Sequence, residues 1–176
     1  MERKNKYIFC DQDSNLLHDL KKDLLKDMRK TKSHAIIITS SDAYSKYFYN
    51  PLFFSLDKKE TVISKQDQCK NIKFDNQLNI FKINPGSEDY MEQCMYSIIT
   101  SAWNAAQKHH DYDLFLIVDH AELLMNDIIS VLCLRSYLDD AAINHLFFYF
   151  ISENQNTVLS SGVVDLQKDI VINERR

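Results

Sequence analysis

Short apolar runs alternate along the chain with longer stretches in which apolar residues recur at helical spacing. The runs lie at 7–10, 34–39, 78–83, 114–118 and 145–151. The run at 114–118 is apolar at every position, which is typical of a strand covered on both faces and central in its sheet. Helical spacing predicts helices over 16–28 and 88–108, and a long helix after Glu122. Strands and helices in this alternation predict parallel strand pairs joined by right-handed crossovers.

Two regions depart from this alternation. Between 43 and 77 the periodicity weakens, and an irregular insertion is predicted there, with aromatic residues around Pro51 followed by a polar stretch. At the other end, 163–166 and 170–172 are predicted as short strands, in a hairpin or at a sheet edge. The whole pattern predicts a single domain over 1–176, a three-layer α/β/α sandwich with a mainly parallel central sheet.

Composition narrows the classes of protein that fit. The 176 residues are 45% hydrophobic and 26% charged, with a net charge of −4 and dispersed basic residues, so direct binding of nucleic acid is not indicated. No apolar run approaches the roughly 18 residues of a membrane span, and no signal-peptide core is present. We therefore expect an intracellular protein, cytoplasmic or nuclear, without membrane contact. The cysteines (Cys10, Cys69, Cys94 and Cys133) are far apart in sequence and are expected to be reduced and mostly buried.

Polar residues follow every central strand of the predicted sheet. They are Asp11 and Asp13, Thr39 and Ser40, Asp119 and Glu122, and Ser152 and Asn154. In open α/β sheets, ligands bind beyond the carboxyl ends of the strands. Any chemistry of this protein is therefore expected at that edge of the sheet.

The stretch from Asp113 to Leu124, a buried strand ending in Asp119 and followed by Glu122, resembles the Walker B element of P-loop ATPases of the RecA/AAA+ group. The resemblance extends over 111–155. It implies a RecA/Rossmann-like fold in which Asp119 holds Mg²⁺ through water and Glu122 is a displaced form of the carboxylate that polarises the attacking water. The following strand, ending in Ser152, resembles the one that carries a polar sensor residue in that group. A competing interpretation is that Asp119 merely caps the next helix.

One element of that family is missing from the sequence. A phosphate-binding loop needs Gly-x-x-x-x-Gly-Lys-Ser/Thr, because glycines let backbone N–H groups surround the phosphates while the lysine neutralises them. The two glycines, Gly86 and Gly162, are not followed by lysine, and the first strand leads into Asp11 and Asp13 instead. Without a phosphate-binding loop, Asp119 and Glu122 are expected to form at most a vestigial nucleotide site. No cofactor is expected.

The resemblance therefore implies a non-catalytic subunit, similar to the P-loop-less accessory subunits of recombination and tRNA-modification assemblies. It would bind a protein partner or another copy of itself, and would contact nucleic acid only through the assembly. The link to nucleic acid depends on fold analogy. The aromatic cluster in the insertion either packs on the core or forms the contact surface. The residues expected at that surface are Tyr44, Tyr47, Phe48, Phe53 and Phe54.

Two alternatives use the same carboxylates differently. Residues 9–17 resemble the signature of haloacid-dehalogenase phosphohydrolases, which implies Asp11 as nucleophile, Asp13 as general acid/base and Thr39 or Ser40 as the phosphate-binding hydroxyl. Asp119, with Asp127, would then join Asp11 in holding Mg²⁺, although Ser14 and Asn15 replace the glycine and threonine of that signature. The other alternative is a receiver-like signalling domain. It would have Asp11 and Asp13 as its acidic pocket, Asp119 as phosphoacceptor, Ser152 as switch hydroxyl and Lys168 as its lysine.

Overall fold

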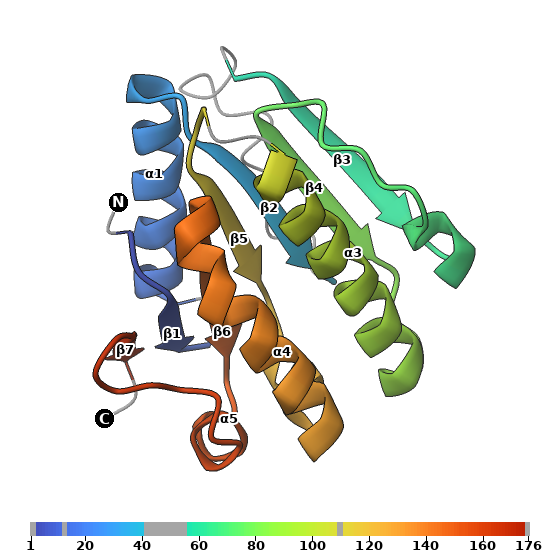
Figure 1. Cartoon of the computed structure of the whole chain (residues 1–176), viewed down its shortest axis with the longest axis vertical. Coiled ribbons are helices and arrows are strands. Elements are labelled where there is room, and N and C mark those ends of the chain that lie inside the picture. The colour runs from blue at the N-terminus through green and yellow to red at the C-terminus, as the bar shows by residue number, and fades with distance from the viewer. Residues whose placement is uncertain (1–2, 12–13, 41–55, 109–110, 175–176) are drawn as a thin grey trace.

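A computed structural model of the chain describes residues 3–11, 14–40, 56–108 and 111–174. A seven-stranded sheet runs through it in the order β3-β4-β2-β5-β6-β1-β7, and every strand pair is parallel (Figure 1). Its strands are β1 (Lys6–Phe9), β2 (His34–Thr39), β3 (Lys58–Ile63), β4 (Leu78–Ile83), β5 (Leu114–Val118), β6 (Leu146–Ser152) and β7 (Ile170–Asn173). The predicted parallel sheet is confirmed.

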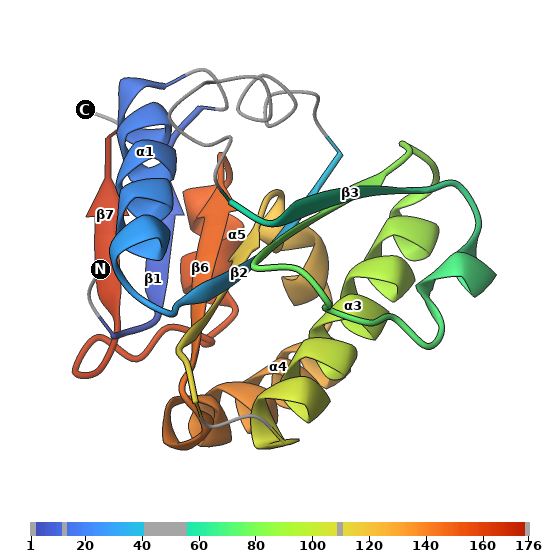
Figure 2. The same cartoon turned by 90° about the horizontal axis from the view of Figure 1, so that it is seen from above.

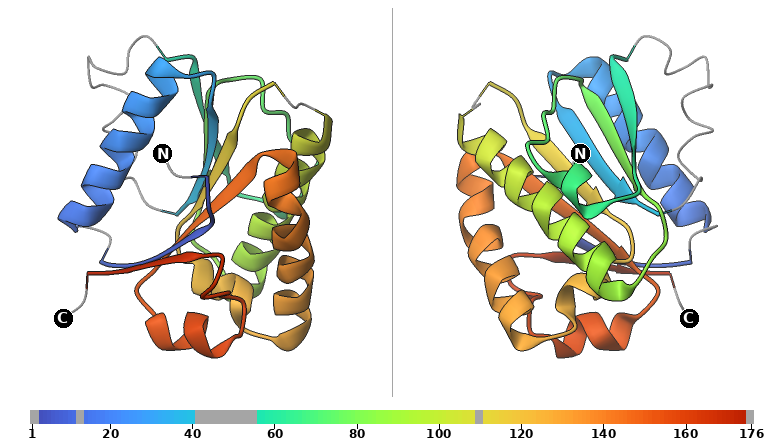
Figure 3. Two further views of the ribbon diagram at one scale, coloured as in Figure 1. Left: turned by 60° about the vertical axis from the view of Figure 1, so that its left-hand side comes forward. Right: turned by 90° about the vertical axis from the view of Figure 1, so that its right-hand side faces the viewer.

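Helices cover both faces of the sheet and complete a three-layer sandwich. The helix α1 (Asn15–Lys30) lies on one face, and α3 (Glu88–Lys108) and α4 (Ile128–Ala141) lie on the other (Figures 2 and 3). Ser14 caps α1 by accepting a hydrogen bond from the Leu17 N–H at 3.1 Å, and Ser87 accepts one from the Tyr90 N–H at 3.2 Å. Shorter elements are η3 (Gln66–Cys69), η4 (Ala121–Met125), η5 (Ala142–Asn144) and α5 (Gln155–Ser160). No helix in the described ranges is long and apolar enough to cross a membrane.

The central strands divide the core into two clusters, one on each face. Alternate residues of β6 take opposite sides: Phe148 and Phe150 contact the cluster under α3 and α4, whereas Phe147 and Tyr149 contact the cluster under α1. All residues of β5 and β6 are buried, which explains why these strands are apolar at every position. The cysteines are free thiols, and three of the four are buried.

One strand lies in a region for which the sequence predicts irregular structure. Residues 58–63, within the predicted insertion at 43–77, form β3 at the edge of the sheet and pair with β4. Its side chains are mostly exposed, because only one neighbouring strand and little of the core cover it. Such a strand lacks the apolar run by which the others were recognised, and charged residues are typical of sheet edges.

The predicted strand at 163–166 is wrong, and so is a terminal hairpin. The segment turns instead: the Asp165 N–H donates to Asp169 Oδ2 at 2.8 Å, and Arg135 of α4 donates from Nη1 to the Val163 carbonyl at 2.8 Å. The chain then enters β7, which pairs in parallel with β1. Because 163–166 forms no strand, it cannot pair with β7 in a hairpin, and β7 extends the sheet as an edge strand.

The helix expected after Glu122 is interrupted. Residues Ala121–Met125 form η4, and α4 begins only at Ile128, where the Asp127 carboxylate accepts a hydrogen bond from the Ser130 N–H at 2.8 Å. The break shifts the helical face, so that Leu134 and Leu138 are buried while Ile128 and Leu132 are 76% and 64% exposed.

Candidate functional site

Asp119 and Thr39 meet at the carboxyl edge of the sheet. Their strands, β5 and β2, are hydrogen-bonded neighbours, and the Asp119 N–H donates to the Ile38 carbonyl at 3.0 Å. The Thr39 hydroxyl donates to Asp119 Oδ2 at 2.7 Å, and both side chains are almost fully buried, at 3% and 2% exposure. A buried carboxylate needs such donors, because its desolvation is costly. The sequence places both residues at strand ends, but the bond between them appears only when β2 and β5 are neighbours.

The turn after Asp119 directs Glu122 toward the next strand. His120 has a left-handed backbone conformation with φ of 54°, which ends β5 and begins η4. Glu122 then accepts a hydrogen bond at Oε2 from the Ser152 hydroxyl at 2.6 Å, and the Asn154 N–H donates to Ser152 Oγ at 2.9 Å. The structure thus joins Glu122 to Ser152, the two residues that the resemblance links to the catalytic carboxylate and the sensor.

His120 is a member of this group that sequence reasoning did not identify. Its Nδ1 lies 3.7 Å from Glu122 Oε1. The neighbouring Glu122 carboxylate raises the pKa of His120 above its ordinary value, against the opposing effect of burial. For Glu122, burial alone would raise the pKa, but the nearby His120 ring and the hydrogen bond from Ser152 outweigh it, so its pKa lies below the ordinary value. The imidazole and the carboxylate therefore stabilise each other's charged forms.

This pair predicts a pH window for stability. Because the folded-state pKa of Glu122 is lowered, ionised Glu122 stabilises the folded protein at pH values above the unfolded pKa of about 4.5. This stabilisation is lost as pH falls through the folded-state pKa. Because the folded-state pKa of His120 is raised, protonated His120 stabilises the folded protein at pH values below the unfolded pKa of about 6.5. This stabilisation is lost as pH rises through the folded-state pKa. We expect Glu122→Gln to reduce the free energy of unfolding by about 1 kcal/mol between these pH values, and by less outside them. Urea unfolding at pH 3.5, 5.5 and 8 measures this.

The matched control for that experiment is Glu88→Gln, which removes an exposed carboxylate from the first turn of α3. It is expected to change the free energy of unfolding by less than about 0.5 kcal/mol at each of the three pH values. A loss in Glu122→Gln that does not vary with pH would contradict the proposed coupling between Glu122 and His120.

Asp11 lies at the same edge of the sheet but not beside Asp119. It follows β1, and β6 lies between β1 and β5, so the two strands are roughly 10 Å apart. One Mg²⁺ ion with bonds of about 2.1 Å would not bridge carboxylates at that spacing without a rearrangement, which weakens the phosphohydrolase interpretation. Asp127 caps α4 instead of facing Asp119. Asp13 and the aromatic residues 44–54 lie outside the described residues. Within the described ranges, no three histidine, cysteine or acidic side chains are grouped to hold a metal ion.

The receiver-like interpretation fails on the position of Lys168. This residue precedes β7 and pairs with Asp165 at 3.9 Å, with its side chain 74% exposed. Because all strands are parallel, the chain before a strand lies at the amino edge of the sheet, whereas Asp119 and Ser152 lie at the carboxyl edge. Lys168 therefore lies at the opposite edge of the sheet from Asp119, the phosphoacceptor in that interpretation.

The parallel seven-stranded sheet with helices on both faces defines this chain as an α/β protein (Figure 2). The solved structures that match include the genome packaging NTPase B204 from Sulfolobus turreted icosahedral virus 2, in complex with ATP-γS. The TM-score is 0.54 at 12% sequence identity, over 92% of this chain and 72% of that chain. At this identity the similarity concerns the fold. No protein-family model matches the sequence, and a search of curated proteins finds no match.

Proposed function

We propose that this protein is a non-catalytic, RecA/AAA-like subunit of an ATPase assembly that handles DNA or RNA. The fold supports the class, since the similar solved structure is a nucleic-acid packaging NTPase. The observation that carries the non-catalytic part is the junction between β1 and α1. In P-loop NTPases the loop at such a strand-to-helix junction holds the triphosphate.

The residues at this junction lack every group that phosphate binding needs. If the eight-residue motif begins at Cys10, directly after β1, its second glycine corresponds to Asn15, its lysine to Leu16 and its serine or threonine to Leu17. Leu17 is fully buried and packs in the cluster under α1. A leucine in the core cannot coordinate Mg²⁺, and no lysine neutralises phosphate here.

One of the N–H groups at the start of α1 is already bonded. Helix N-termini bind anions through unpaired N–H groups, but here the Leu17 N–H donates to Ser14 Oγ at 3.1 Å. Asp11, next to Cys10, adds negative charge where phosphate would lie. Burial raises the pKa of the Cys10 thiol, and neither form of a thiol carries a positive charge for phosphate.

Exposed apolar residues on α4 support a role in assembly. Ile128, Ile129 and Leu132 are 76%, 71% and 64% exposed, and their spacing places them together at the start of the helix. Grouped apolar side chains of this kind mark contact surfaces more often than single exposed residues do. The proposed partner is another protein or a second copy of the chain, with the sequence-based contact residues at 44–54 as the other candidate surface.

The test is ATP turnover by the full chain with Mg²⁺, measured as phosphate release. We expect no release above the protein-free rate, and the same result for Asp119→Asn. Release that is lost in Asp119→Asn would overturn the proposal, because it would show a working nucleotide site at the carboxyl edge. Turnover is measured in preference to binding because a nucleotide bound elsewhere on the protein would not be hydrolysed at Asp119.

The same preparation tests the phosphohydrolase alternative. Incubation with Mg²⁺ and a generic phosphomonoester should release no phosphate. Release that disappears in Asp11→Asn would select the phosphohydrolase and refute the non-catalytic role.

A further inference from the structure

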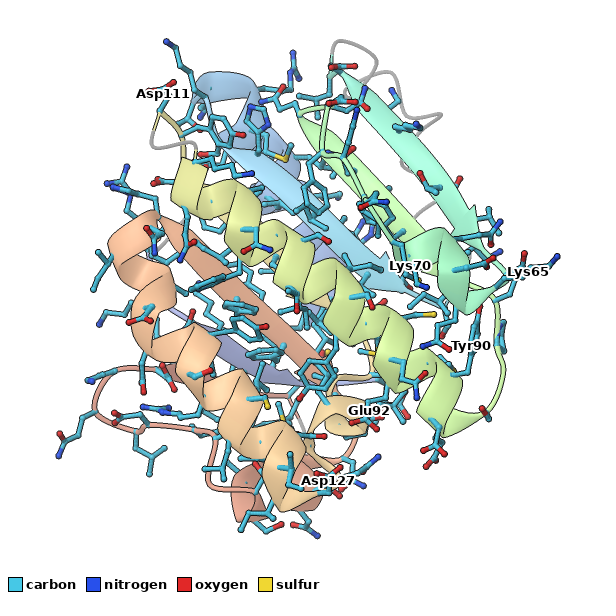
Figure 4. The ribbon with its side chains drawn as sticks, turned by 45° about the vertical axis from the view of Figure 1, so that its right-hand side comes forward. Lys65, Lys70, Tyr90, Glu92, Asp111 and Asp127 are labelled. Carbon is cyan, nitrogen blue, oxygen red and sulfur yellow. The ribbon has the colours of Figure 1, made fainter. Side chains whose placement is uncertain are left out.

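A hollow of about 430 Å³ lies at the amino edge of the sheet, opposite Asp119. It is enclosed by the chain at 71–76, by the last turns of α3, and by the starts of β2, β4 and β5. Figure 4 shows Lys70, after which the chain returns along α3 to the amino end of β4. The volume is within the range of small-molecule sites.

Aromatic rings line this hollow from three separate segments. His34 and Tyr112, at the starts of β2 and β5, stack on each other with centroids 3.8 Å apart and planes 14° apart. Phe74, from the 71–76 segment, is fixed edge-on against Phe81 at 5.8 Å. Rings that are held in place offer flat surfaces for a heterocycle at little cost in side-chain entropy.

Carboxamides with fixed orientation stand beside the rings. Asn79 is 4% exposed, and its Nδ2 donates to the Asn76 carbonyl at 2.7 Å. The side chain of Asn76 in turn donates to Asp57 Oδ1 at 2.7 Å. Asn104 of α3 also lines the hollow. A carboxamide carries a donor and an acceptor side by side, and this is the pattern that pairs with the N6 and N7 edge of adenine. Because the amide groups of Asn79 and Asn76 already donate within the protein, Asn104 is the carboxamide that we assign to the base.

Charged groups complete the lining. Lys73 comes from the 71–76 segment and Lys108 is the last residue of α3, so lysines line the hollow from two of its walls. Asp75 also lines it, and a carboxylate accepts hydrogen bonds from ribose hydroxyls. We propose that this hollow binds a purine nucleotide, with adenine as the base that its carboxamides fit best. Both candidate ligands present a nucleoside monophosphate. One is a free nucleotide and the other is one unit of a single-stranded nucleic acid.

This site is independent of the proposed non-catalytic role, because it lies at the opposite edge of the sheet from Asp119. Titration calorimetry of the full chain with AMP and with adenosine tests it. AMP is expected to bind at least about tenfold more tightly than adenosine, since only AMP carries a phosphate for Lys73 and Lys108. In Lys108→Met this preference should fall severalfold. Tyr112→Leu, checked for folding by circular dichroism, should weaken both ligands by about tenfold, which corresponds to about 1.4 kcal/mol.

A control variant separates this site from the rest of the molecule. Lys26→Met removes an exposed lysine from α1, on the other face of the sheet, and should bind AMP like the unmodified protein. A short single-stranded oligoadenylate that competes with AMP and binds more tightly would identify the strand as the source, and weaker competition would identify free nucleotide. The proposal is overturned if AMP does not bind, if Lys108→Met keeps the full preference for AMP, or if Lys26→Met reduces that preference as much as Lys108→Met does.

Discussion

Replacing Phe148 with alanine should lower the free energy of unfolding by about 3 to 5 kcal/mol, the range for truncating a fully buried phenylalanine. Phe148 lies in β6, is completely buried, and stacks on Phe150 with ring centroids 5.3 Å apart. The sheet lies on one side of it and the helices α3 and α4 cover the other, so neighbouring side chains have little freedom to fill the space. Urea unfolding followed by circular dichroism measures the change.

The controls for Phe148 separate cavity formation from a general effect of substitution. Phe148→Leu keeps most of the volume and should cost clearly less than the alanine variant. Leu166→Ala removes a side chain that is 78% exposed, and is expected to stay within about 0.5 kcal/mol of the unmodified protein. A loss below about 1 kcal/mol in Phe148→Ala would mean that β6 is not central in the sheet.

The second large effect is expected at the pair of Thr39 and Asp119. Thr39→Val has a similar shape but removes the hydroxyl that donates to Asp119 Oδ2 at 2.7 Å. Losing a hydrogen bond to a buried charged group costs about 2 to 3 kcal/mol, because the carboxylate keeps its desolvation penalty. We therefore expect the free energy of unfolding to fall by that amount at neutral pH.

A double-mutant cycle shows whether the charge of Asp119 causes this loss. In an Asp119→Asn background the side chain is neutral, so Thr39→Val should cost about 1 kcal/mol, as for an ordinary hydrogen bond. An equal cost in both backgrounds would show that Thr39 does not act through the carboxylate.

Local patterns predicted much of the fold but less of the site. The strand at 114–118 follows from a few adjacent residues, and the structure has it. The edge strand β3 was missed because its side chains face solvent and carry no apolar signal. The shift in the face of α4 followed from a single interruption after Glu122, which helical spacing alone did not reveal.

The candidate site depends on which strands are neighbours. The sequence indicates that Thr39, Asp119 and Ser152 end buried strands, but not that β5 lies between β2 and β6. That order joins Thr39 to Asp119 and Ser152 to Glu122, and it places β6 between Asp11 and Asp119. The left-handed turn at His120 likewise appears only in three dimensions, although histidine tolerates this conformation better than most residues.

The sequence by itself determined the layered α/β class, the central strand and the lack of a glycine-rich phosphate loop, because each depends on the types and spacing of residues close together in the chain. The tertiary structure alone decided the strand order, the hydrogen-bonded carboxylates and the hollow beside α3, because their groups come from segments brought together by the crossovers. Periodicity records which face of an element is buried, whereas the neighbour that buries it is set by the path of the whole chain.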